Sequence, residues 1–170
     1  MAEEQRGEAS PDALMTRIGQ VVMLHTGGDR DEARNRFAAL WEEIGEDGDP
    51  LHRCTLAHYM ADTQDDPADE LAWDVLALRA ADSLTEALTD NRPTGHGAAG
   101  QRRTLALRAL YPSLHLNLAA DYVKLGRHAA ARRELDRARE RAGVLGDDEY
   151  GDGVRAAIAR LELRLEGPAA

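Results

Sequence analysis

Apolar residues recur three and four positions apart along most of this 170-residue chain. That spacing places them on one side of an α-helix, whereas a half-buried strand requires strict alternation. The pattern predicts seven helices, over residues 11–26, 29–45, 50–63, 67–89, 103–124, 128–143 and 149–166. Most of the turns between them are short, so neighbouring helices are expected to pack as antiparallel pairs. The chain is therefore predicted to have an all-α fold.

The predicted helix starts carry recognisable capping signals. Ser10, Asp49 and Asp66 each precede a proline. A side-chain acceptor followed by proline is typical of an N-cap and the first helical position. Asp29 has Glu32 three residues later, which is the spacing of a capping box.

The fifth segment is less regular than the others, whereas the fourth has a clear helical stripe. Pro112 lies inside the fifth segment, where it predicts either a kink or a second helix that begins after Tyr111. Residues 89–101 are rich in Gly and Pro and predict a long loop. The predicted core stripe of the fourth segment consists of Leu71, Val75, Leu76 and Leu78.

The charge of the chain is acidic and unevenly distributed. The sequence has 21 basic and 31 acidic residues, for a net charge of −10 with neutral histidines. Residues 1–100 hold 8 basic and 21 acidic groups, whereas residues 101–170 hold 13 and 10. An acidic surface repels nucleic acid and attracts a basic partner. We therefore expect no nucleic-acid binding, and the acidic half favours a basic protein partner.

Composition also bears on the compartment. No stretch approaches the ~20 apolar residues that a membrane span needs. Residues 1–10 are acidic, have no apolar signal region, and are predicted to be a disordered tail. A single cysteine, Cys54, cannot form an internal disulfide, which suits a reducing compartment. We expect a cytoplasmic protein without a membrane partner.

An internal repeat relates two parts of the chain. Residues 18–44 align with residues 116–142. The alignment pairs Gly28 with Gly126, Ala33 with Ala131, and Phe37 with Leu135. Since a lone helical hairpin cannot bury its apolar face, such units are expected to stack.

The second of these units resembles the tetratricopeptide repeat (TPR), a helix–turn–helix motif of 34 residues. The matching positions are Leu118, Ala119, Tyr122, Gly126, Ala131, Leu135 and Ala138. His115 stands where the family usually has Trp. A middle unit spans residues 51–78, with Ala72 and Leu76 at the corresponding offset. The resemblance implies one TPR-like solenoid domain over residues 11–166, with about three helix pairs and a C-terminal capping helix.

The resemblance also implies a non-catalytic adaptor that binds a protein or peptide on a concave surface lined by the first helix of each pair. Cys54, His58 and Asp62 follow one another at intervals of four, and carrying the repeat over turns this stripe towards that groove. The other expected groove residues are His115, Asn117 and Lys124. A homodimer would complete so short an array.

A second interpretation uses the same residues. Cys54 with His58, or His58 with Asp62, could hold a metal ion as a pair four residues apart, with His115 or His25 as a third ligand. The chain would then be a regulatory or sensory domain that binds a small ligand or metal at Cys54, His58, Asp62 and His115, or a metal-dependent enzyme. Because enzyme signatures are nearly absent, we expect no catalytic activity and no cofactor.

Overall fold

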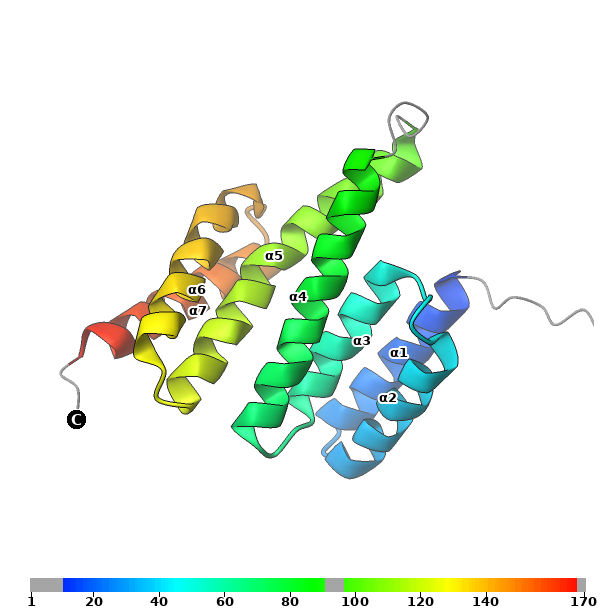
Figure 1. Ribbon diagram of the computed structural model, residues 1–170, viewed down its shortest axis with the longest axis horizontal. Coiled ribbons are helices and arrows are strands. Elements are labelled where there is room, and N and C mark those ends of the chain that lie inside the picture. Colours follow the sequence, from blue (N-terminus) through cyan, green and yellow to red (C-terminus); the bar gives the residue numbers. More distant parts are fainter. Residues whose placement is uncertain (1–10, 91–96, 168–170) are drawn as a thin grey trace, which may run out of the picture.

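Seven α-helices follow one another side by side in the computed structural model (Figure 1), which describes residues 11–90 and 97–167. They are α1 (Pro11–Thr26), α2 (Arg30–Ile44), α3 (Pro50–Asp62), α4 (Pro67–Asp90), α5 (Ala98–Lys124), α6 (His128–Arg141) and α7 (Glu149–Glu166). A short 3₁₀ turn, η1 (Ala142–Val144), follows α6. The described residues contain no strand, and the fold is an all-α, TPR-like solenoid. None of the described helices is long and apolar enough to cross a membrane.

Two of the predicted N-caps are confirmed. The Asp49 carboxylate accepts a hydrogen bond from the Leu51 N–H at 2.8 Å, and Asp66 accepts one from the Ala68 N–H at the same distance. Each bond satisfies one of the free N–H groups at a helix start. Ser10 and the rest of the predicted tail lie outside the described residues.

The capping box predicted at Asp29 is wrong. Its side chain makes no capping hydrogen bond, although its carbonyl accepts from the Ala33 N–H. The preceding turn explains this result, because the Asp29 N–H is bonded to the Leu24 carbonyl and its backbone takes φ −92° and ψ 68°. An N-cap side chain normally reaches its target from an extended backbone.

The turns of the first and third hairpins share one hydrogen-bond pattern. Gly28 has φ +100° and Gly126 has φ +71°. Residues that carry a Cβ atom strongly disfavour such positive φ angles. The matching backbone bonds are Asp29 N–H to Leu24 O, Gly28 N–H to His25 O, Arg127 N–H to Tyr122 O, and Gly126 N–H to Val123 O. The first and third hairpins, α1–α2 and α5–α6, are therefore built on equivalent turns, as the alignment of their glycines predicted.

The α4–α5 pair is longer than its neighbours. α4 has 24 residues and α5 has 27, and their ends project beyond the other helices (Figure 1). Pro112 neither ends α5 nor begins a new helix, because α5 continues without a break from Ala98 to Lys124. The loop predicted over residues 89–101 is too long, since α5 begins at Ala98; residues 91–96 of it lie outside the described part.

Three apolar clusters form the core, and they overlap along the stack. The first joins α1, α2 and α3, the second joins α3, α4 and α5, and the third joins α5, α6 and α7. In α7 the buried side chains are Val154, Ile158, Leu161 and Leu165. α7 therefore covers the apolar side of the last hairpin, as expected of a capping helix.

The core register of α4 differs from the prediction. Ala72 is exposed, and the predicted stripe of leucines and valine is only half-buried. The buried residues of α4 are Asp74, Ala77, Ala81 and Leu84. Leu76 and Leu78 pack at the edge of the second apolar cluster, so the buried face of α4 is rotated relative to the predicted stripe. The sequence-based equivalence of Ala72 with Ala131, and of Leu76 with Leu135, was therefore wrong.

Counting from each helix start shows the corrected equivalence. The eighth residue of the second helix in each pair is buried in all three hairpins, and so is the eleventh. At the eighth position the residues are Phe37 in α2, Asp74 in α4 and Leu135 in α6. The middle hairpin, α3–α4, thus carries a carboxylate where the other two carry a large apolar group.

Candidate binding site

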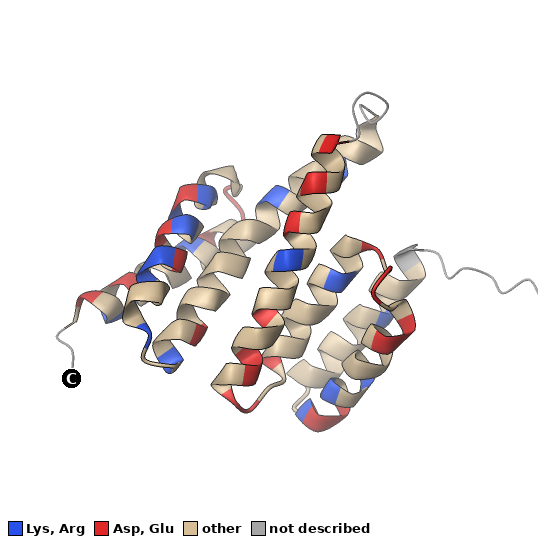
Figure 2. Ribbon diagram, in the orientation of Figure 1, with Lys and Arg blue, Asp and Glu red and all other residues tan. Residues whose placement is uncertain are grey.

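Polar side chains from three helices meet around that carboxylate. We refer to them as the interhelical polar cluster, which consists of His58, Asp62, Glu70, Asp74, Asn117, Asp121 and Lys124. α3 supplies the first two, α4 the next two, and α5 the last three. The nearby α3–α4 turn adds further acidic residues (Figure 2), so this end of the helices is strongly negative.

Two contacts join α5 to the middle hairpin. The side-chain amide nitrogen of Asn117 lies 2.9 Å from Nδ1 of His58, and Asp74 Oδ1 lies 3.8 Å from the same ring nitrogen. Lys124 donates from Nζ to both carboxylate oxygens of Glu70, at 2.8 and 2.7 Å. His58 and Lys124 therefore tie the first helix of the third hairpin to both helices of the second.

The two buried carboxyl groups are the unusual feature of the cluster. Asp74 is 2% exposed and Asp121 is 1% exposed. Burial, the charge of Asp74 and a hydrogen bond with Asp74 raise the pKa of Asp121 to about 9. The pair therefore retains one proton near neutral pH. Even so, Asp74 Oδ1 and Asp121 Oδ2 have no hydrogen-bond partner among the described residues.

The same surroundings also shift the pKa values of His58 and Asp62. Burial on its own would lower the pKa of His58, but Asp74 and Asp62 outweigh that effect and raise it above its usual value. Burial also raises the pKa of Asp62, assisted by the negative charges of Asp74 and Glu70 and opposed by His58 and His25.

The structure brings together four of the six residues predicted for the groove. His58, Asp62, Asn117 and Lys124 all belong to the cluster, although no contact shows a ligand role for them. Lys124 is already paired with Glu70, so it does not present a free cation for a peptide carboxylate.

Cys54 and His115 are placed elsewhere, and their assignment to the groove needs correction. Cys54 is 1% exposed and lies in the apolar cluster with Ala77 and Ala81, where burial raises the pKa of its thiol to about 12. His115 is 5% exposed, and its Nδ1 lies 2.8 Å from Glu134 Oε2 on α6. Both side chains therefore pack against a neighbouring helix.

The metal centre inferred from the sequence is not assembled. Within the described residues, no group of three or more His, Cys, Asp or Glu side chains is placed to hold a metal ion. Cys54 is a protonated thiol in an apolar environment, which is a poor metal ligand. The spacing of four residues along α3 was compatible with a pair of ligands but provided no third one.

Sequence reasoning missed Glu70, Asp74 and Asp121. Glu70 lies in the first turn of α4, where the helix dipole alone would explain an acidic residue. Counting from Pro67 would have placed Asp74 at the core position of Phe37 and Leu135. For Asp121 no comparable signal exists, because its burial depends on how α4 crosses α5.

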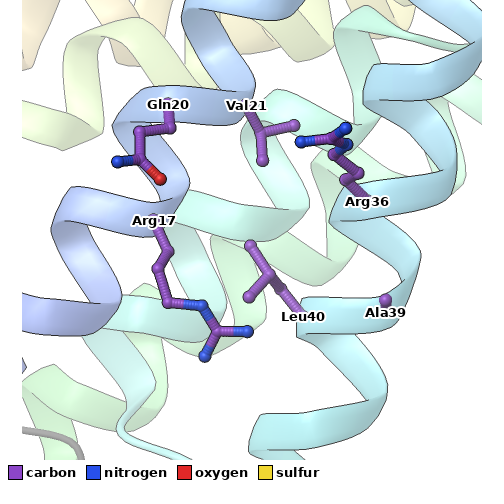
Figure 3. A pocket seen from close by; sticks show the side chains of 6 residues that line it. All are labelled: Arg17, Gln20, Val21, Arg36, Ala39 and Leu40. Atoms are coloured by element: carbon purple, nitrogen blue, oxygen red, sulfur yellow. The ribbon is translucent and has the colours of Figure 1, made fainter.

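A separate surface depression lies on the first hairpin. It has a volume of about 220 Å³ between α1 and α2, lined by Arg17, Gln20, Val21, Arg36, Ala39 and Leu40 (Figure 3). Both arginines are already engaged, Arg17 with Glu43 and Arg36 with Glu32. None of its lining residues belongs to the interhelical polar cluster, and it offers no free charged group to a ligand.

The arrangement defines the chain as an α-helical hairpin repeat protein. Within it, the sequence model of the tetratricopeptide repeat family matches residues 112–137. This match covers the second half of α5, the Gly126 turn and most of α6, and it confirms the resemblance there. No curated protein and no solved structure matches the chain. A tetratricopeptide repeat suggests a role in protein–protein interaction.

Proposed function

We propose that this protein is a non-catalytic adaptor that binds a protein or peptide partner through the concave surface lined by α1, α3 and α5. The interhelical polar cluster is the contact site in this proposal, with His58 and Asp62 on α3 and Asn117 on α5. The observation that carries it is the convergence of polar side chains from consecutive hairpins, since a partner that contacts several repeats needs such a shared surface.

The charge of the site supports a basic partner. Four carboxyl groups of the cluster, together with the acidic α3–α4 turn, produce a negative field at one end of the helices (Figure 2). α6 instead carries five arginines and three acidic residues, so its net charge is positive. A basic partner would therefore be steered towards the cluster rather than α6.

The alternative of a sensory domain for a metal or small ligand receives less support. It depended on Cys54, His58, Asp62 and His115 acting together, and two of these side chains are buried against other helices. A cytoplasmic location remains part of the proposal, as does a homodimer.

Comparative affinity purification tests the proposal. The full chain, a His58→Ala/Asp62→Ala variant and a Glu86→Gln control would be used as baits from the same cell extract. Glu86 is an exposed carboxylate three turns beyond Asp74 on α4. We expect specific partners to be lost from the double variant and kept by the control, with circular dichroism showing that all three fold. Equal recovery by all three baits would contradict the proposal.

A further inference from the structure

The interhelical polar cluster contains more negative charge than its own side chains compensate. It has four carboxyl groups and one permanent cation, Lys124, which is bonded to both oxygens of Glu70. The Asp62 carboxylate forms no hydrogen bond or ion pair within the described residues. Asp62 and Asp74 are thus left without a permanent cation of their own, and the nearest basic group to Asp74 is the His58 ring, at 3.8 Å.

The buried pair adds an independent observation. Asp74 Oδ1 and Asp121 Oδ2 are buried without a hydrogen-bond partner in the described part of the chain. Nearly all buried polar atoms in native proteins are hydrogen-bonded, so two such oxygens on adjacent helices require an explanation. The one proton that the pair retains can serve as a donor between the two carboxyl groups, which leaves the negative charge of Asp74 to attract a donor from outside the chain.

The more exposed members of the cluster lie next to these oxygens. Asp62 is exposed at the last turn of α3, and the His58 side chain, one turn earlier, is 28% exposed. His58 lies against Asp74, at 3.8 Å. An incoming cation would meet Asp62 first and reach Asp74 when the His58 ring shifts.

The kind of cation follows from the geometry. The described residues offer no group of three ligands suited to a metal ion. An ammonium has three N–H donors and a guanidinium has five, and both form charge-assisted hydrogen bonds to carboxylates without a fixed coordination shell. Carboxylates at different depths therefore suit an elongated organic cation.

We propose that the interhelical polar cluster binds one basic side chain, lysine or arginine, of a protein partner, with Asp62 and Asp74 as its counter-charges. This inference deepens the proposed function and depends on it for the source of the cation. Protons compete with the ligand at His58, which lies between Asp62 and Asp74, and His25 of α1 also acts on Asp62. Binding is therefore stronger at pH 8 than at pH 6.

Nuclear magnetic resonance titration of the ¹⁵N-labelled full chain tests this directly. The probes are the N-acetyl, N′-methylamide forms of arginine and lysine, and the uncharged controls are the same forms of citrulline and norleucine. We expect saturable shifts of amides near the cluster with the charged probes alone. Asp62→Asn, at an exposed site that tolerates substitution, should weaken binding roughly tenfold, because one charge-assisted bond is lost. Asp74→Asn should weaken it too, whereas Glu86→Gln should leave it unchanged.

Other outcomes overturn the inference. Equal shifts with citrulline and norleucine, shifts confined to other helices, or no saturation would exclude a cation site here. Saturation of the same amides by Zn²⁺ or Mg²⁺ at lower concentration than by the organic probes would identify a metal site instead. If partner capture depends on His58 and Asp62 while the probes do not bind, the inference fails and the proposed function stands. If the probes bind the cluster but the His58→Ala/Asp62→Ala variant captures partners as well as the full chain does, the cation site stands and the proposed function fails.

Discussion

The outer hairpins and the middle hairpin solve the same packing problem in different ways. In α1–α2 and α5–α6 the helices meet over Phe37 and Leu135, and a glycine with positive φ closes each turn. In α3–α4 the equivalent core position is Asp74, and the turn contains no glycine. Thr63, fully buried, donates there from Oγ1 to the Met60 carbonyl. At this position the outer hairpins bury an apolar side chain and the middle one buries a carboxylate, although α5–α6 also buries Asp121 and the His115–Glu134 pair elsewhere.

The comparison teaches where the stack can tolerate a functional group. A carboxylate at a core position destabilises a fold unless its neighbours compensate. Asp74 is flanked by hairpins that each bury a full apolar stripe. Stability supplied by the outer hairpins therefore allows the middle one to keep unsatisfied oxygens, as binding sites often do.

Truncating the core of an outer hairpin should have the largest effect. Phe37→Ala removes a ring that is 1% exposed and stacked near Tyr59, so the free energy of unfolding should fall by about 3–5 kcal/mol. Urea denaturation followed by circular dichroism measures it. Met23→Ala, at a side chain that is 74% exposed, is the control and should change little. Equal effects of the two substitutions would mean that α2 does not pack as described.

The buried pair should give the middle hairpin its own pH dependence. The folded-state pKa of Asp121 is about 9, above its value in the unfolded chain, so the folded state holds a proton that the unfolded state releases. Stability from this group is complete below about pH 4, because both states are then protonated. It is lost progressively as the pH rises towards 9. The carboxyl groups Asp49 and Glu134 act oppositely, because their pKa values are lowered.

Asp121→Asn separates these contributions. Asparagine does not titrate, so the variant should not become less stable between about pH 5 and 9. It should still lose stability at acid pH, where Asp49 and Glu134 become protonated. Urea midpoints measured at intervals of one pH unit, for the variant and the wild-type chain, provide the test. Parallel pH profiles would show that Asp121 is ionised in the folded protein at neutral pH.

Replacing the carboxylate in the middle hairpin should stabilise the fold. Asp74→Leu installs the residue that α6 has at the equivalent position and removes a buried oxygen without a partner. We expect a gain of about 1–3 kcal/mol in the free energy of unfolding, together with weaker binding of the basic probes. Asp136→Leu on the exposed face of α6 is the matched control and should change stability by less than about 0.5 kcal/mol. A marked loss of stability in Asp74→Leu would show that the carboxylate holds the hairpins together.

The smallest effect is expected at the turns. Gly126→Ala forces a Cβ into a backbone with φ +71°, so it should destabilise the fold by about 1–2 kcal/mol. Gly153→Ala within α7 should instead stabilise it by about 0.5–1 kcal/mol, because that helical position has open space around it. Thermal unfolding of both variants gives the comparison, and a stabilised Gly126→Ala would contradict the equivalence of the two outer turns.

Prediction from the sequence succeeded where local rules operate and failed where a neighbouring helix decides. Asp49 and Asp66 cap their helices because an N-cap depends on residues two or three positions away. His58 and Asp62 were found because positions four apart share a helix face. Cys54 shares that spacing, yet Ala77 and Ala81 of α4 cover it. His115 was likewise assigned to the groove, whereas Glu134 of α6 binds its ring.

By itself, the sequence determined the helical periodicity, most of the helix boundaries and the equivalence of Gly28 and Gly126, because each depends on contacts within a few residues. Only the tertiary structure decided which face of α4 is buried and that Asp74 meets Asp121 without enough donors for both. Burial, and with it the pKa of a carboxyl group, is a property of the helices packed around it, and no local pattern along the chain specifies that packing.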